Sequence, residues 1–216
     1  MICAGCGEWA DRPAVRSGPV VECAHCGHRE PFRRLPLFAL TGPSGTGKST
    51  VGRLLPARLG SDVIVLEQDL LWVDALRDPA DDYAAFRQTW LRLIAMLHQN
   101  GRPVLLCGAV VPPQLEHRPE RPLLGDIHYL ALTASDDALR TRLRARPAWR
   151  EWDDARIAEM ITFNHWVKEN TTTPQMTLLD TTDRTPEQTA DEVAAWVRDH
   201  GPSNTAGTTA MPSDRR

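Results

Sequence analysis

Residues Leu37–Ser49, with the sequence LFALTGPSGTGKS, contain the pattern that decides the fold. The apolar run at its start reads as a buried strand, and Gly42–Ser49 fits G-x-x-x-x-G-K-[ST] at every defined position. Glycines let successive backbone N–H groups face phosphate oxygens. Lys48 supplies a charge for the β- and γ-phosphates, and the Ser49 hydroxyl is the expected Mg²⁺ ligand. Since Thr50–Leu59 has helical spacing, the sequence predicts a strand, a phosphate-binding loop and a helix that together bind a nucleoside triphosphate.

The loop and the start of its helix supply the candidates for nucleotide binding. These candidates are Gly42, Ser44, Gly45, Thr46, Gly47, Lys48, Ser49 and Thr50. Pro56 falls inside the helix, so we expect a kink or an early end there. Gly60 is the expected stop.

The composition is that of an ordinary globular protein. The chain has 216 residues, of which 42% are hydrophobic and 25% charged, and its net charge is −3. This charge gives no general attraction to nucleic acid or to an anionic membrane. No apolar run approaches the roughly 20 residues of a membrane span, and the N-terminus lacks the pattern of a secretion signal. We therefore expect a cytoplasmic protein whose partner is a small molecule, with nucleic acid disfavoured.

Four of the five cysteines form two C-x-x-C pairs with 16 residues between them. They are Cys3, Cys6, Cys23 and Cys26, and the spacing is typical of a closed structural Zn²⁺ site with four thiolate ligands. A disulfide-linked segment and a redox C-x-x-C are the alternatives. A cytosolic location disfavours the first, and the lack of a flanking βαβ pattern disfavours the second. Cys107 lies in an apolar run and reads as a small core residue.

The pattern divides the chain into three segments. Residues 1–35 are too few and too polar to form a core unaided, so zinc would supply the folding free energy. This segment resembles a zinc ribbon, through which a protein partner could dock, and Glu30–Pro36 reads as its connector. Residues 36–200 form the nucleotide-binding domain. Residues 201–216 offer little to bury, so we expect disorder there.

Strands and helices alternate after the phosphate-binding loop. The expected strands after the first are 62–67, 103–108, 127–132 and 176–180, and the expected helices include 81–99, 153–168 and one from Thr185 to about Asp199. Thr185–Gln188 reads as a capping box with proline at the first helical position. This alternation predicts an α/β fold in which helices cover both faces of a five-stranded parallel sheet.

Five arginines fall within eleven residues that contain no acid: Arg140, Arg142, Arg144, Arg146 and Arg150. Guanidinium groups can clamp the negative charge that spreads over a phosphoryl group during its transfer. A solvated helix face is the alternative reading of such a charge run.

Three stretches together resemble the small P-loop kinases, a group that includes nucleoside and nucleotide, gluconate and shikimate kinases and antibiotic phosphotransferases. The stretches are TGPSGTGKST, TASDDALRTRLRAR and LLDTTDRTPEQTADEVAAWV, and the resemblance covers about residues 36–200. It implies a P-loop NTPase three-layer fold with strand order 2-3-1-4-5, an arginine-bearing lid and an acceptor pocket beyond the second strand. On this resemblance Arg142 and Arg146 are lid arginines, and Asp180–Thr182 lies beside the adenine.

The resemblance also implies a carboxylate just after the second strand that orients the acceptor hydroxyl or takes its proton. Asp69 matches that position best, with Glu67 in reserve. Alternatively, Asp69 only caps the following turn. The chain departs from the pattern at the third strand, which ends in Cys107 and Gly108 instead of an acid. Either Asp69 or Glu67 holds Mg²⁺ through water, or the metal site is assembled differently.

We therefore expect a kinase that uses ATP and Mg²⁺, with a structural Zn²⁺ in its N-terminal segment. It would transfer the γ-phosphoryl group to a hydroxyl of a nucleoside-like or sugar-like molecule. The predicted catalytic residues are Lys48, Asp69, Arg142 and Arg146. The alternative is an ATPase module whose ribbon docks a protein or a nucleic acid. His117, Arg118 and Arg121, in a proline-rich loop, either contact the acceptor or belong to a plain connector.

Overall fold

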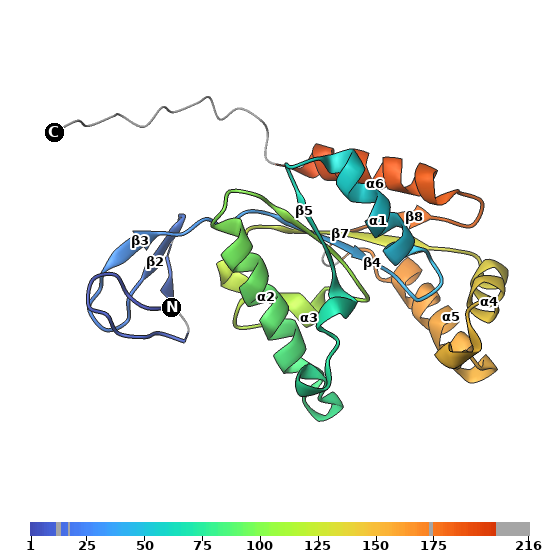
Figure 1. Ribbon diagram of the computed structural model, residues 1–216, viewed down its shortest axis with the longest axis horizontal. Helices are drawn as coiled ribbons and strands as arrows, with labels where there is room; N and C mark the ends of the chain where they lie inside the picture. The colour runs from blue at the N-terminus through green and yellow to red at the C-terminus, as the bar shows by residue number, and fades with distance from the viewer. Residues whose placement is uncertain (12–13, 17, 173–174, 202–216) are drawn as a thin grey trace.

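The computed structural model describes residues 1–11, 14–16, 18–172 and 175–201, which form a small and a large sheet (Figure 1). The large sheet is parallel, with five strands in the order β5-β6-β4-β7-β8. Its strands are β4 Leu37–Thr41, β5 Ile64–Glu67, β6 Val104–Cys107, β7 Ile127–Thr133 and β8 Met176–Asp180. Numbered within this sheet, the order is 2-3-1-4-5, which confirms the predicted fold.

The central strand β4 is buried on both faces, as its continuous apolar run predicts. It pairs with β6 on one side and β7 on the other. Leu37 and Ala39 belong to one core cluster, whereas Phe38 and Leu40 belong to a second. Successive side chains of one strand therefore seal both helical layers.

Each face of the sheet is covered by its own helices. Helices α1 (Lys48–Leu59) and α6 (Pro186–His200) pack on one face, and α2 (Ala84–His98) and α3 (Pro113–Glu116) cover the other (Figure 1). Helices α4 (Asp136–Arg144) and α5 (Asp154–Glu169) have a third, smaller core of their own. That core includes Leu139, Leu143, Ile157 and Ile161.

The predicted capping box is confirmed, since Thr185–Gln188 begins α6. The side chains of Ser135 and Asp153 also cap α4 and α5. The expected early end at Pro56 is wrong, since α1 continues through it to Leu59.

Helix α2 begins three residues later than the sequence predicts. Asp82 and Tyr83 both have φ = 55°, a left-handed conformation that interrupts the helix. The segment before them forms three 3₁₀ turns, Gln68–Leu71, Asp74–Leu76 and Pro79–Asp81. This segment joins β5 to α2 on the side where the acceptor pocket is expected.

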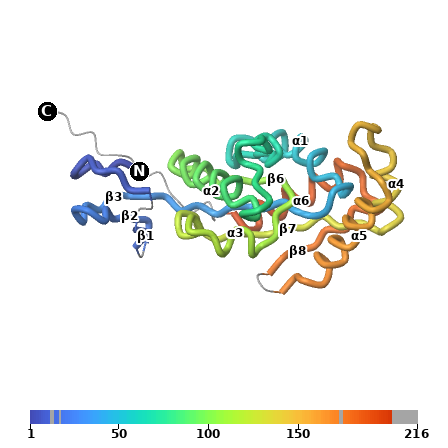
Figure 2. Tube along the Cα trace, turned by 90° about the horizontal axis from the view of Figure 1, so that it is seen from below, coloured from blue at the N-terminus to red at the C-terminus, as the bar shows by residue number. Residues whose placement is uncertain are grey.

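The small sheet is antiparallel and belongs to the cysteine-rich segment. It comprises β1 (Ala14–Val15), β2 (Val20–Glu22) and β3 (Arg29–Pro31), and it lies at one end of the molecule, away from α4 and α5 (Figure 2). The boundaries predicted at residues 35 and 200 stay predictions, and residues 202–216 of the expected disordered tail lie outside the described residues. Over the part that is described, none of the helices combines the length and hydropathy of a membrane span.

Candidate nucleotide site and four-cysteine cluster

The loop between β4 and α1 has a backbone that requires glycine. Gly42, Gly45 and Gly47 have φ values of 125°, 95° and 96°. A Cβ added at Gly42 would lie 2.2 Å from the carbonyl oxygen of Leu132 on β7, so a side chain cannot fit there. The loop therefore follows the carboxyl end of β4 closely and leads directly into the N-terminus of α1. A phosphate bound there would meet free backbone N–H groups and the positive end of the helix dipole.

Lys48 folds back onto this loop. Its Nζ donates to the carbonyl oxygens of Gly42 at 2.6 Å and Pro43 at 2.9 Å. Burial lowers the pKa of Lys48 to about 8, although the carboxylates of Asp69 and Glu67 partly oppose this shift. A nearby phosphate would favour the charged ammonium. The geometry thus suits a lysine that exchanges carbonyl partners for an anionic ligand.

The two candidate acids lie beside the start of α1. Glu67 ends β5, Asp69 follows in the next turn, and both line a cavity of about 320 Å³ together with Ser49. Cys107 lines the same cavity, and burial raises the pKa of its thiol to about 12, so it is neutral and cannot replace a carboxylate. The structure therefore brings the predicted Mg²⁺ ligand and both acids together, and it leaves the end of β6 uncharged.

Among the described residues the carboxylate of Asp69 has no hydrogen bond or salt bridge, so no side-chain bond supports the capping alternative; only the backbone carbonyl of Asp69 is bonded, accepting from the N–H of Trp72 at 3.0 Å. Its carboxylate lines a second cavity, of about 490 Å³, with Ser44, Trp72 and Arg146. No motif or spacing in the sequence indicates a role for Trp72. Its signal is weak, because an exposed tryptophan in a turn gains meaning only from the cavity that it faces.

Gln68, between the two acids, is a second residue of this region that no sequence motif indicates. It is buried, and a Cβ added at Gly108 would lie 1.7 Å from its Oε1. Packing of Gln68 on Gly108 therefore fixes the direction in which Glu67 and Asp69 leave the turn. A glycine directly after a strand at the carboxyl edge is the signal that could have indicated this contact.

The arginines of residues 140–150 differ in their surroundings: some match the solvated-face alternative and others lie at the candidate nucleotide site. Arg140 and Arg144 form exposed ion pairs with Asp137 and Asp154, as the solvated-face alternative predicts. Arg142 is held in place, because it donates to the side chain and the carbonyl of Thr181, at 3.0 and 2.6 Å, and to the carbonyl of Thr182 at 3.1 Å. It lines a third cavity, of about 330 Å³, together with loop glycines and Thr50.

Arg146 lies between the cavities. It lines both the 330 Å³ cavity beside the glycine loop and the 490 Å³ cavity beside Asp69. Its guanidinium lies 5.4 Å from the ring centroid of Trp152. Burial lowers its pKa, and the charge of Arg150 lowers it further. An anion bound beside Arg146 and Arg150 would reduce the repulsion between their guanidinium groups.

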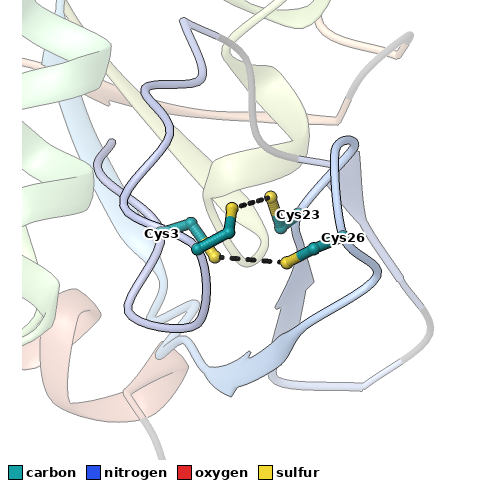
Figure 3. Close-up of side chains that lie close together, drawn as sticks. Cys3, Cys23 and Cys26 are labelled. Carbon is teal, nitrogen blue, oxygen red and sulfur yellow. Dashed lines mark hydrogen bonds between the residues drawn. The ribbon is translucent and has the colours of Figure 1, made fainter.

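The four paired cysteines meet at one point. Their Sγ atoms all lie within 4.8 Å of one another. Cys3 and Cys26 are 3.7 Å apart, and Cys6 and Cys23 are 3.8 Å apart (Figure 3). Zn–S bonds of about 2.3 Å at tetrahedral angles give S···S distances of about 3.8 Å, whereas a disulfide needs about 2.05 Å. All four are free thiols, so the cluster fits zinc and is not disulfide-linked.

Backbone groups also favour thiolates in this cluster. The N–H of Gly5 donates to Cys3 Sγ at 3.3 Å. Backbone hydrogen bonds from Cys26 and His25 lower the pKa of the Cys23 thiol. Cys3 is buried, while Cys6 and Cys26 are exposed. A bound zinc would therefore be reachable by a chelator.

We expect about one zinc per chain in freshly purified protein, because four thiolates complete a tetrahedral site. Cys6→Ser should lower the metal content and unfold residues 1–35, measured by elemental analysis and amide exchange. Cys107→Ser is the matched control, since this thiol lies in the core far from the cluster, and it should retain zinc. Metal-free wild-type protein would contradict the zinc assignment.

The pH dependence of MgATP binding should report Lys48. The phosphates raise the pKa of Lys48 above its value of about 8 in the free protein, so binding takes up a proton once the pH exceeds 8. Calorimetry should show that the Kd of MgATP does not change with pH through Lys48 below about pH 7. Above pH 8 this Kd should rise by up to roughly tenfold per pH unit. Lys48→Arg should remove that slope, because guanidinium stays charged. A flat wild-type profile up to pH 9.5 would argue against this role.

Gly108→Ala should displace Gln68 and, with it, the two acids. We expect a loss of about 1–3 kcal/mol in unfolding free energy from overpacking, and a fall in Mg²⁺-dependent ATP turnover of roughly tenfold or more. The double variant Gln68→Ala/Gly108→Ala removes the clash and should recover most of the stability. Equal stability of the wild type and the single variant would exclude the contact as a constraint.

Comparison with known proteins agrees with this geometry. Residues 39–162, more than half of the chain, match the family described as AAA domain. The chain is 31% identical to the shikimate kinase of Geobacter sulfurreducens, over 74% of this chain and 90% of that protein. It is also 31% identical to the shikimate kinase of Psychrobacter cryohalolentis, over 58% of this chain and 70% of that protein. A tRNA dimethylallyltransferase of Bordetella pertussis is 31% identical as well, but the match covers only 42% of its length.

Solved structures share the fold. A putative kinase from Chloroflexus aurantiacus matches with a TM-score of 0.56 at 21% identity, over 79% of this chain and all of that one. The APS kinase of Mycobacterium tuberculosis matches with a TM-score of 0.53 at 21% identity, over 78% of this chain and 99% of that one. The four-cysteine segment lies outside the family match. The chain belongs to the AAA domain family and to the P-loop small kinases related to shikimate kinases.

Proposed function

We propose that the protein is an ATP- and Mg²⁺-dependent kinase that phosphorylates a hydroxyl of a small molecule. The observation that supports this proposal is that three cavities at one edge of the sheet share lining residues. Asp69 lines the two cavities on the β5 side, and Arg146 lines both the glycine-loop cavity and the Trp72 cavity. A nucleotide held by the loop and an acceptor beside Trp72 would therefore meet at these two side chains.

Each group at the junction has a chemical role in the proposal. Backbone N–H groups of the loop and Lys48 would bind the phosphates, and Ser49 would ligate Mg²⁺, with Glu67 and Asp69 bound to it through water. When bound, the Mg²⁺ ion neutralises charge on the β- and γ-phosphates. Asp69 would orient the acceptor hydroxyl and take its proton as the new P–O bond forms and the bond to ADP breaks.

The two predicted lid arginines receive different roles. Arg142 already makes three hydrogen bonds to the Thr181–Thr182 loop, so it would hold that loop beside the nucleoside part of ATP. Arg146 reaches both sides of the junction, so it would stabilise the charge on the phosphoryl group in transit. Loss of Arg146 would then lower kcat, whereas loss of Arg142 would mainly weaken nucleotide binding.

The aromatic residues that follow β5 favour an acceptor that has a flat face on which an aromatic ring can stack. Trp72 is 41% exposed and is backed by Tyr83 and Phe86, with ring centroids 5.1 and 5.0 Å away. Sugar and nucleoside rings both present such a face. A nucleoside-like or sugar-like acceptor remains the proposal.

The second candidate function is an ATPase module that docks a partner through its ribbon. One observation favours it, namely the exposed apolar side chains of Met1, Ile2 and Trp9 on the cysteine-rich segment. Ile2 and Trp9 face each other across an isolated antiparallel bridge. ATP hydrolysis that only a macromolecule stimulates, with no phosphorylated small product, would support this candidate over the kinase.

A screen of hydroxyl-bearing metabolites with MgATP should find an acceptor that accelerates ADP release and carries the phosphate afterwards. With that acceptor, Asp69→Asn should lower kcat by roughly 10²–10⁴-fold and leave the Kd of MgATP within about threefold. Asp137→Asn is the matched control, because Asp137 is an exposed acid paired only with Arg140, and it should behave as the wild type. A wild-type kcat for Asp69→Asn would remove this residue from the proposed mechanism.

A further inference from the structure

The cysteine-rich segment is tied to the kinase domain by a shared arginine. Arg92 on α2 places its Nη2 2.9 Å from Oδ1 of Asp11 and 3.2 Å from Oε1 of Glu120. The side chain of Glu120 is 2% exposed, and Gln88 also donates to its Oε1, at 2.6 Å. Its second oxygen is buried and has no hydrogen-bond partner among the described residues. A buried carboxylate in this state depends strongly on the guanidinium beside it.

Two further contacts hold the segment against the same helix and loop. Gln99, just after α2, brackets the backbone of Arg33: it accepts from the N–H at 2.9 Å and donates to the carbonyl at 3.0 Å. Phe32 packs against the core cluster under α2. Val15 of the segment and Leu123 of the kinase domain also line one cavity of about 160 Å³, together with Arg92 and Glu120. Both views show the small sheet beside α2 (Figures 1 and 2).

The helix and the loop that hold the segment also reach the acceptor wall. Arg118, two residues before Glu120, lies 3.6 Å from Oδ2 of Asp82, and Arg87 on α2 lies 2.5 Å from the same oxygen. Asp82 and Tyr83 are the adjacent residues with left-handed φ. Side chains other than glycine keep this conformation only where their surroundings impose it. The ion pairs of Asp82 with Arg87 and Arg118 are part of those surroundings.

Tyr83 connects this strained pair to the cavity. The guanidinium of Arg87 lies 5.8 Å from its ring centroid, and the same ring packs against Trp72 at 5.1 Å between centroids. Trp72 lines the cavity that contains Asp69. Side-chain contacts, joined by two short chain segments at residues 118–120 and 82–83, therefore link the carboxylate of Asp11 to the wall beside the proposed acceptor.

We propose that the zinc-loaded segment is a positioning element for the acceptor side of the site, with Arg92, Glu120 and Arg118 as its positioning residues. This inference rests on the proposed function for one point only, namely that the acceptor binds beside Trp72. Zinc occupancy gives the segment two states, because metal binding supplies its folding free energy. Without the folded segment, Arg92 loses Asp11, the surface over Glu120 opens to water, and the loop that carries Arg118 is less restrained. Helices α1 and α6 pack on the opposite face of the sheet and keep their contacts.

Hydrogen exchange on the full-length protein tests this coupling without an acceptor. Zinc removal by a chelator should speed amide exchange roughly tenfold or more in residues 82–92 and 113–123. Exchange in α1 and α6 should stay unchanged, and the Kd of MgATP should stay within about threefold. Faster exchange confined to residues 1–35, or spread equally over the whole chain, would overturn the proposal.

A variant that keeps the four cysteines separates docking from metal loss. Asp11→Asn should retain one zinc and still speed exchange in residues 113–123, by a smaller factor than chelation does. Glu22→Gln is the matched control, because Glu22 pairs with Arg16 and Arg29 inside the segment. Equal exchange in the two variants would refute the role of Arg92. Failure of the proposed kinase function would be seen separately, as absent MgATP binding or an empty acceptor screen with this coupling intact.

Discussion

The close approach of one glycine to a neighbouring strand sets the position of every other group in the site. Gly42 follows the buried central strand and lies against the backbone of Leu132 with no room for a side chain. The loop is thereby fixed at the carboxyl edge of the sheet, with the N-terminus of α1 directly behind it. Because parallel strands all end at this edge, β5 brings Glu67 to the same edge of the sheet, where it lines a cavity with Ser49. The remaining sequence only needs to place short turns after these strands.

The sequence predicts this part of the fold well because its signals are local. The loop motif, the apolar strands and the capping box each depend on residues a few positions apart. The packing of Gln68 on Gly108 joins residues 40 positions apart, and no spacing rule connects them. Helical propensity likewise favours a start at Asp81, whereas ion pairs to Asp82 support a left-handed pair that delays α2. The unpredicted features are those fixed by tertiary contacts.

The arginine run shows how one pattern can hold several functions. Exposed pairs such as Arg144 with Asp154 contribute little to stability and give no reason to assign chemistry. Arg142 donates three hydrogen bonds to the Thr181–Thr182 loop, so its guanidinium is held in place without a ligand. Arg146 is different, since it is partly buried near another guanidinium and has a lowered pKa. Repulsion between like charges in a cleft is relieved by an anionic ligand, which supports Arg146 as the group that meets the transferred phosphoryl.

The neutral end of β6 determines how this site could support a metal ion. β6 lies between β5 and the central strand, and it ends in a protonated thiol beside α1. The carboxylates therefore come from the edge strand β5, two strands away from β4 and so about 10 Å from it at the strand ends. From that distance Glu67 and Asp69 are better placed to hold water on a metal bound by Ser49 than to ligate it directly. The direction of these two carboxylates would then depend on the packing of Gln68 on Gly108. In that arrangement an uncharged contact helps to position Mg²⁺, which an acid at the end of β6 would otherwise do.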